Sequence, residues 1–407
     1  MSYPKVFLKE GKEESLKRFH PWIFSGAIES ADALNDGDVV EVYTSEKKFI
    51  AEGHYQTGSI AIRVLSFKQE PIDRDFWEQR LNNAFDVRDT LGMIAGIKGD
   101  IYRFVHGEGD NLPGLIIDIY GKTAVIQAHS VGMHLCRMEI AEVLAEIMEE
   151  DIENIYYKSV NTLADSEGTQ VESEDDVVLS SLPLSESGFL KGKATKLIAN
   201  EDNFKFHIDF LKGQKTGFFI DQRESRILLE EYAFSRSVLN LFCYSGGFSV
   251  HALRGGAELV HSVDSSARAI ELTNSNVALN YPRGASHVAY VEDAFKYLDR
   301  MDEPYDLIIL DPPAFAKHRS ALENARKGYR RLNAKAIEKI TRGGIIFTFS
   351  CSQVVSRDDF RTIVFSAAAS VGRKVRILNQ LTQPADHPVN IFHPEGEYLK
   401  GLVLYVE

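Results

Sequence analysis

The stretch SVLNLFCYSGGFSVHALRGGAELVHSVD, residues 237–264, decides the fold of the C-terminal half of the chain. It contains a buried-type strand over Val238–Phe242, a turn with two glycines, a helical pattern, and a second strand over Leu259–Val263. Three further buried-type strands are predicted over His287–Val291, Leu307–Leu310 and Ile345–Phe349. Apolar strands that alternate with helices predict a parallel sheet covered on both faces. We therefore expect a doubly wound, Rossmann-like α/β domain.

Three domains are predicted along the 407 residues. Residues 1–70 hold short β-branched runs separated by Asp-Gly and Thr-Gly turns, which predict a small β-barrel. Residues 71–187 hold a helical pattern over Phe76–Leu91, several strands, an acidic helix over Met133–Glu150 and an exposed acidic connection, which together predict a central α+β domain. Residues 188–407 are assigned to the α/β domain.

Charge is distributed unevenly along the chain. The formal net charge is −13, and residues 138–187 alone hold fourteen acidic residues against one basic residue, Lys158. The remainder is close to neutral, so the acidic total does not exclude a nucleic-acid partner. Residues 311–342 hold nine Lys and Arg against three Asp and Glu, which indicates either a phosphate-binding surface or the solvated face of a helix.

The sequence also bears on where the protein is found in the cell and on whether it binds a metal. There is no apolar stretch of about 18 residues and no signal-peptide pattern at the start, so we expect a cytoplasmic protein without a membrane partner. Cys136, Cys243 and Cys351 are an odd number of thiols at unrelated spacings, which indicates neither disulfides nor zinc. No metal is therefore predicted, and the segment Phe392-His393-Pro394 has no assigned chemical role.

A cofactor loop is predicted after the first strand of the α/β domain. Its residues are Tyr244, Ser245, Gly246, Gly247 and Phe248. Glycines at a strand-to-helix turn allow a ligand to approach the backbone, although a tight turn that binds nothing looks similar. Asp264 ends the second strand, where a carboxylate can accept both ribose hydroxyls, and Asp293 ends the third. These strand ends together predict a cofactor that contains a nucleoside.

The fourth strand leads into Asp311-Pro312-Pro313-Ala314-Phe315. Two prolines stiffen the backbone, and Phe315 offers a flat apolar face, so the segment can hold a planar base while Asp311 meets its polar edge. The motif resembles the Asp/Asn-Pro-Pro-aromatic signature of methyltransferases that act on nucleobases. This resemblance favours S-adenosylmethionine over nicotinamide as the cofactor.

The fifth strand runs directly into Cys351, at the same sheet edge as Asp311. Carbon 5 of cytosine is a weak nucleophile, and addition of a thiolate at carbon 6 makes it reactive enough to accept a methyl group. Cys351 is therefore the candidate nucleophile, with an inert buried thiol as the alternative. Cys243 is interpreted as a packing residue of the cofactor loop.

Taken together, these motifs resemble the ribosomal RNA large-subunit methyltransferase I family, which forms 5-methylcytosine in 23S rRNA. The resemblance extends over nearly the whole chain and includes four further segments: Arg18-Phe19-His20-Pro21-Trp22-Ile23-Phe24-Ser25-Gly26-Ala27, His106-Gly107-Glu108-Gly109-Asp110-Asn111-Leu112-Pro113-Gly114-Leu115, Lys215-Thr216-Gly217-Phe218-Phe219-Ile220-Asp221-Gln222-Arg223, and Ala385-Asp386-His387-Pro388 with Tyr398-Leu399-Lys400-Gly401. The first of them is similar to the start of that family's RNA-binding PUA domain.

The resemblance implies a class I methyltransferase domain behind a PUA-like barrel, with S-adenosylmethionine as cofactor and RNA, namely 23S rRNA, as partner. It implies Cys351 and Asp311 as catalytic residues, and Asp221 and Arg223 beside the cofactor. The substrate-binding candidates are Pro312, Pro313, Phe315, Lys317, Arg330 and Arg331. Related cytosine-5 enzymes often carry a second cysteine where this chain has Ala314, which leaves the base that removes the C5 proton unassigned. A homodimer is left open.

Two alternatives remain at the level of sequence. A methyltransferase of the same fold acting on a guanine or adenine nitrogen would use the Asp-Pro-Pro segment and need no cysteine. A non-catalytic RNA-binding assembly protein would use only the basic segment and the N-terminal barrel.

Overall fold

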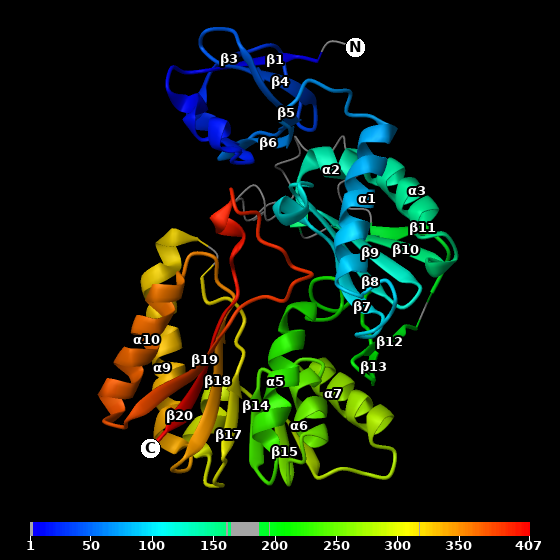
Figure 1. Ribbon diagram of the computed structural model, residues 1–407. Coiled ribbons are helices and arrows are strands. Elements are labelled where there is room, and N and C mark those ends of the chain that lie inside the picture. Colours follow the sequence, from blue (N-terminus) through cyan, green and yellow to red (C-terminus); the bar gives the residue numbers. More distant parts are fainter. Residues whose placement is uncertain (1–2, 160–161, 164–186, 195, 317) are drawn as a thin grey trace, which may run out of the picture. The chain divides into compact units, whose positions relative to one another are not determined.

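The computed structural model describes residues 3–159, 162–163, 187–194, 196–316 and 318–407 (Figure 1). These residues form two compact units. Unit 1 takes the described residues up to Asn203, together with Ile208–Phe218 and Ala385–Gly396. Unit 2 takes Phe204–His207, Phe219–Pro384 and Glu397–Glu407. The chain therefore passes between the units more than once. The predicted division into three domains stays a prediction.

The N-terminal sheet of unit 1 has six strands in the order β2-β6-β5-β4-β1-β3. Their bounds are β1 Lys5–Leu8, β2 Trp22–Phe24, β3 Ile28–Ala31, β4 Val39–Tyr43, β5 Phe49–Tyr55 and β6 Ile60–Ser66. Only β1 and β4 pair in parallel, and the other neighbours are antiparallel. Alternating aliphatic side chains such as Val40, Val42 and Val64 form the buried core of this sheet.

The second sheet of unit 1 has five strands in the order β11-β10-β9-β8-β7. Their bounds are β7 Ile101–His106, β8 Leu115–Tyr120, β9 Thr123–Ala128, β10 Asn154–Lys158 and β11 Ser187–Lys191. The helices of this region are α1 Arg74–Thr90, α2 Val131–Leu135 and α3 Arg137–Ile147. The predicted helix over residues 133–150 is thus divided at Cys136, where the ψ angle of 1° departs from the α-helical value, although the Cys136 carbonyl still accepts the Ile140 N–H at 3.0 Å.

A buried arginine joins three segments of unit 1. Arg88, on the inner face of α1, has no exposed surface, and its Nη2 donates to Asp110 Oδ2 at 2.8 Å and to the Asp386 carbonyl at 2.9 Å. Its Nε donates to the Arg103 carbonyl at 2.8 Å, and Asp386 Oδ2 in turn accepts the Arg103 backbone N–H at 3.0 Å. The network therefore attaches residues 385–396 to the five-stranded sheet.

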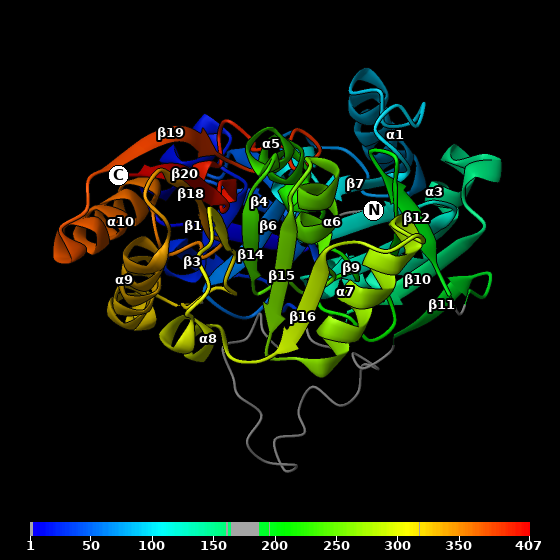
Figure 2. The same ribbon diagram turned by 90° about the horizontal axis from the view of Figure 1, so that it is seen from below.

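The sheet of unit 2 has seven strands in the order β16-β15-β14-β17-β18-β20-β19 (Figure 2). Their bounds are β14 Ser237–Leu241, β15 Leu259–Asp264, β16 His287–Val291, β17 Leu307–Leu310, β18 Gly344–Ser350, β19 Val375–Leu381 and β20 Lys400–Val406. The first five are parallel, whereas β20 is antiparallel to both of its neighbours. The five predicted strands are confirmed, and β19 and β20 extend the sheet beyond them.

Helices cover both faces of this sheet, as the apolar strands require. They are α5 Arg223–Ala233, α6 Gly247–Arg254, α7 Ala267–Asn280, α8 Ala294–Arg300, α9 Leu322–Lys339 and α10 Arg357–Val371. Ile308 and Leu310 of β17 pack in the core formed with α8, α9 and α10, and Ile309 packs in the core formed with α5 and α6. The predicted doubly wound α/β domain is confirmed. Within the described ranges, no helix combines the length and the apolar character needed to cross a bilayer.

We expect Arg88→Met to lower the free energy of unfolding by about 3–5 kcal/mol, because it leaves the Asp110 carboxylate buried without its cation. Urea denaturation followed by tryptophan fluorescence measures the change. Arg74→Met is the matched control, because Arg74 lies on the same helix and makes an exposed ion pair with Glu146, worth at most about 1 kcal/mol. Equal losses in the two variants would contradict the assignment of Arg88 as the anchor.

Candidate functional site

The carboxyl ends of the parallel strands of unit 2 gather the predicted site residues at one edge. β14 lies at the centre, between β15 and β17, so the strand order reverses beside it. Ligands of open α/β sheets bind outside the strand ends at such a reversal. The loop after β14, Asp264 after β15 and Asp311 after β17 all belong to this edge.

The loop after β14 has an unusual backbone. Phe242 and Tyr244 have φ angles of 61° and 46°, in the left-handed region that non-glycine residues rarely adopt. The loop is held there by Tyr244, whose N–H donates to Asp264 Oδ2 at 3.1 Å and whose carbonyl accepts from Thr273 Oγ1 at 2.9 Å. Strain of this kind is maintained when the surrounding structure fixes it, and it concentrates at ligand sites.

The two glycines of this loop are required by helix packing. A Cβ on Gly246 would lie 2.7 Å from Thr273 Cγ2, and one on Gly247 would lie 2.9 Å from Arg226 Cδ. The close approach of neighbouring side chains therefore explains the glycines without a ligand. The Phe248 side chain packs in the core against Phe349, with ring centroids 5.8 Å apart. Only the backbone of Phe248, at the N-terminus of α6, therefore faces the loop.

Two predicted carboxylates differ in their surroundings. Asp264 is half-buried, and besides the Tyr244 N–H it accepts the Ser266 N–H at 2.9 Å. Asp293 is exposed and caps α8 by accepting the Lys296 N–H at 3.0 Å. Each carboxylate oxygen has two lone pairs, so both groups can still accept hydrogen bonds from a ligand.

The segment before α5 brings a further set of acceptors to the edge. Tyr398 Oη donates to Asp221 Oδ2 at 2.7 Å, and Gln222 Nε2 donates to Asp311 Oδ1 at 3.0 Å. Gln222 Oε1 is buried, and it has no hydrogen-bond partner among the described residues. Arg223 is fully buried at the start of α5. Carboxylate and amide oxygens in this arrangement suit a ligand rich in hydroxyl and amino donors.

Cys351 follows β18 and is half-buried, with its Sγ 4.0 Å from the Pro312 carbonyl oxygen. Lys400 begins β20, opposite Ser350 in the strand register, and is 4% exposed. Its Nζ donates to the carbonyls of Ser352 and Tyr398 at 2.7 and 2.6 Å. Burial lowers the pKa of Lys400 to about 8, against the smaller opposing effect of negative charge on Cys351. A cation is thus held close enough to Cys351 to favour its thiolate form.

The other two cysteines have different surroundings. Burial raises the pKa of Cys136 and of Cys243 to about 12 in each case. Cys243 lies 3.5 Å from Thr273 Oγ1, in the packing position expected from the sequence. Neither thiol is a ready nucleophile at neutral pH.

The segment after β17 lies beside Cys351. Pro312 is buried, Pro313 is exposed, and the half-buried ring of Phe315 packs on Tyr329 with centroids 4.5 Å apart. One face of Phe315 is therefore directed to the protein core instead of a ligand. The roles of these residues toward a base stay predictions.

The basic segment contains both paired and unpaired cations. On α9, Arg326 pairs with Asp359, Lys335 pairs with Asp299, and Lys339 donates to a carbonyl. Arg330 and Arg331 are exposed and have no ion pair within the described part of the chain, and Arg331 lies over the Phe295 ring at 5.0 Å. Lys317 falls outside the described residues.

Sequence reasoning missed Lys400 and Gln222 as site residues. Lys400 carried a signal, because a lysine precedes the apolar run Gly401–Val406 that forms β20. Gln222 lies between Asp221 and Arg223, which were both predicted, but only the fold shows its contact with Asp311.

Known proteins match this chain over nearly its whole length. A family model of S-adenosylmethionine-dependent methyltransferases matches residues 176–392, and a PUA-like domain model matches residues 6–67. The chain is 38% identical to ribosomal RNA large subunit methyltransferase I of Aeromonas hydrophila, with 98% of each chain covered. It is 36% identical to the protein of that name from Salmonella arizonae, with 100% of this chain and 98% of the relative covered.

Solved structures support the fold. A structure described as an S-adenosylmethionine-dependent methyltransferase from Streptococcus mutans has a TM-score of 0.82 at 23% identity, and all of both chains is covered. A methyltransferase in complex with SAH has a TM-score of 0.83 at 23% identity, again over all of both chains.

The electrostatic interaction between Lys400 and Cys351 predicts a measurable change in thiol reactivity. Lys400→Met should raise the pH at which Cys351 becomes alkylated by about one unit, because removing a nearby cation destabilises the thiolate. Iodoacetamide labelling over a pH series, with mass spectrometry of the Cys351 peptide, measures the midpoint.

Lys374→Met is the control for this change, because Lys374 is exposed and its loss should leave the midpoint unaltered. Cys243 should stay unlabelled at neutral pH in all variants, because burial raises its pKa to about 12. Identical midpoints in Lys400→Met and the native protein would show that Lys400 does not act on the thiol.

Proposed function

The chain belongs to the ribosomal RNA large subunit methyltransferase I family, and we propose from that premise that it methylates carbon 5 of a cytosine in large-subunit ribosomal RNA through a covalent bond to Cys351. The observation that carries the proposal is the half-buried Cys351 thiol beside the buried Lys400 ammonium, at the edge where the cofactor loop and the Asp-Pro-Pro segment also lie.

The cofactor is S-adenosylmethionine, which supplies an electrophilic methyl group when bound. Asp264 would accept the ribose hydroxyls, and Asp293 and the loop from Tyr244 to Phe248 would complete the nucleoside site. Asp221, Gln222 and Arg223 would meet the remaining polar groups of the cofactor. The buried Gln222 Oε1, which has no hydrogen-bond partner among the described residues, fits an amino donor of this kind.

Cys351 starts the reaction in this proposal. Its thiolate adds to carbon 6 of the cytosine, and the electron pair of the C5–C6 double bond makes carbon 5 the nucleophile that accepts the methyl group. A base then takes the C5 proton, the C–H electron pair restores the double bond, and the C6–S pair leaves with sulfur. Lys400 favours the thiolate at both the start and the end of this cycle.

RNA binding is proposed for two surfaces. The PUA-like domain over residues 6–67 is one of them, because such domains commonly bind RNA. The exposed guanidinium groups of Arg330 and Arg331 on α9 are the other, because cations without an ion pair in the described structure can contact phosphate at little cost.

We expect Cys351→Ala to reduce methyl transfer to unmodified 23S rRNA by at least about a hundredfold. Transfer of labelled methyl groups, followed by identification of the modified nucleoside, measures both rate and product. Cys136→Ala is the matched control, because this thiol belongs to unit 1 and its pKa is raised to about 12. Undiminished transfer by Cys351→Ala, or a product methylated on a guanine or adenine nitrogen, would refute the proposed chemistry.

Reversing both charges with Arg330→Glu and Arg331→Glu should weaken RNA binding and reduce the slope of its salt dependence by about one for each phosphate that the variant no longer neutralises. Affinity for S-adenosylmethionine should stay the same. Arg283→Glu is the control, because Arg283 is exposed on the connection after α7. If the double variant binds RNA with the same affinity and the same salt dependence as Arg283→Glu, the basic segment is a solvated helix face.

A further inference from the structure

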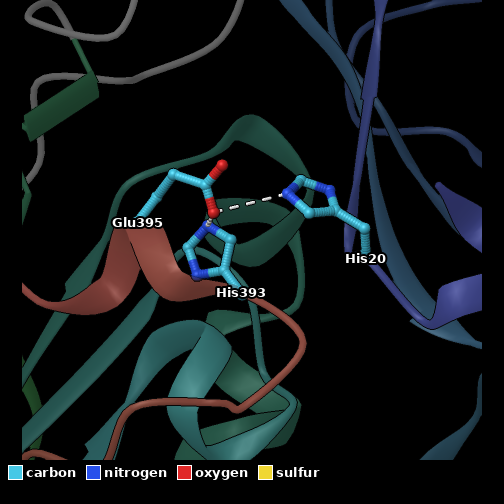
Figure 3. A group of neighbouring side chains, drawn as sticks. All are labelled: His20, His393 and Glu395. Atoms are coloured by element: carbon cyan, nitrogen blue, oxygen red, sulfur yellow. Dashed lines mark ion pairs between the residues drawn. The ribbon is translucent and has the colours of Figure 1, made fainter.

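Three side chains that the proposed methylation does not use lie together in unit 1. His20 precedes β2 of the N-terminal sheet, and His393 and Glu395 belong to the segment Ala385–Gly396. One potential ligand atom from each residue lies within 4.8 Å of the other two, and Figure 3 shows the two rings turned toward the same carboxylate. Two parts of the chain that are far apart in sequence thus bring three metal-binding groups to one place.

The separations fit ligands of a common ion better than direct hydrogen bonds. Glu395 Oε2 lies 3.4 Å from His20 Nε2 and 3.8 Å from His393 Nε2. N–H···O hydrogen bonds have donor–acceptor distances of about 2.7–3.2 Å. Two ligands on a tetrahedral ion with bonds of about 2.0–2.1 Å lie about 3.3 Å apart. Small side-chain adjustments would bring the three atoms to that spacing.

His393 supplies a second, independent observation. The residue is 2% exposed, and neither of its ring nitrogens has a hydrogen-bond partner in the described part of the chain. Its ring packs against Trp22, with centroids 4.3 Å apart. A buried imidazole is normally hydrogen-bonded or bound to a metal, so His393 has capacity for a ligand that protein atoms do not fill.

His20 faces Glu395 through Nε2 and the Trp22 backbone through Nδ1. Its Nδ1 lies 3.4 Å from the Trp22 carbonyl oxygen and 3.2 Å from the Trp22 backbone nitrogen. In the structure the Trp22 N–H donates to Nδ1. Binding a metal through Nε2, which faces Glu395, requires the proton on Nδ1, and a small turn of the ring would then let Nδ1 donate to the Trp22 carbonyl. Metal-bound histidines commonly donate their second N–H to a backbone carbonyl in this way.

We propose that His20, His393 and Glu395 bind one zinc ion. Two imidazoles and a carboxylate suit Zn²⁺, whereas Mg²⁺ and Ca²⁺ prefer sites made of oxygen atoms. The Glu395 side chain is 50% exposed, so water can take the fourth position. The ion ties residues 385–396 to the N-terminal sheet, as Arg88 ties them to the five-stranded sheet.

Zinc titration of the full chain tests this site. After removal of metal with a chelator, calorimetry should show one equivalent of Zn²⁺ bound with a Kd below about 1 µM. The same addition should raise Tm. Co²⁺ in place of Zn²⁺ should give the visible absorption of a tetrahedral site without the strong near-ultraviolet band of thiolate ligands.

Variants separate this site from other zinc-binding groups. Glu395→Gln should weaken zinc binding by at least about tenfold, and because Glu395 is half exposed the variant should still fold. His393→Gln should weaken it at least as much. Glu397→Gln is the matched control and should bind like the native chain, because Glu397 pairs with Arg357. Cys351→Ala should also keep the ion.

Absence of zinc binding at 100-fold excess over the expected Kd (about 100 µM free Zn²⁺), or equal affinities in Glu395→Gln and Glu397→Gln, would overturn the proposal. Loss of the bound ion in Cys351→Ala would instead place zinc at the thiol, and would overturn it as well. Zinc affinity is measured without RNA or S-adenosylmethionine, so its outcome is independent of the proposed methylation.

Discussion

The pairing of β18 with parallel β17 on one side and antiparallel β20 on the other is the constraint on which the site depends. It places Thr348 beside Leu310, and Ser350 beside Lys400. The chain then leaves β18 as Cys351, within 4.0 Å of the Pro312 carbonyl. The carbonyls of Ser352 and Tyr398 hold the Lys400 ammonium before any substrate arrives, so the charge needs no reorganisation during reaction.

Burial has opposite consequences for the thiols and for this amine. It raises the pKa of Cys136 and Cys243 to about 12, which keeps both in the neutral form. It lowers the pKa of Lys400 to about 8, which still leaves the amine mostly charged at neutral pH. Cys351 is only half-buried and lies beside that charge. The electrostatic surroundings therefore distinguish Cys351 from the other two thiols.

Local sequence patterns predicted much of this structure and missed what depends on distant contacts. The five parallel strands were predicted because each is a short apolar run, and their order along the chain brings Asp311 and Cys351 to one edge. The return of β20 between β18 and β19 was not predicted, since it is set by pairing between remote segments, and Lys400 was missed for the same reason. Gly246 is predicted to let a ligand approach the backbone, and the close approach of Thr273 independently excludes a side chain there; the ligand role stays a prediction. The cytosine chemistry and the individual site roles stay predictions.

Trapping with 5-fluorocytidine-containing 23S rRNA and S-adenosylmethionine is the decisive experiment for a covalent bond between Cys351 and the target base. Fluorine at carbon 5 cannot leave as a proton does, so the bond between sulfur and carbon 6 should persist. We expect an RNA–protein complex that survives denaturation, with the nucleotide attached to the peptide containing Cys351. An adduct on Cys136 or Cys243, or methylated RNA with no adduct at all, would contradict the proposed mechanism.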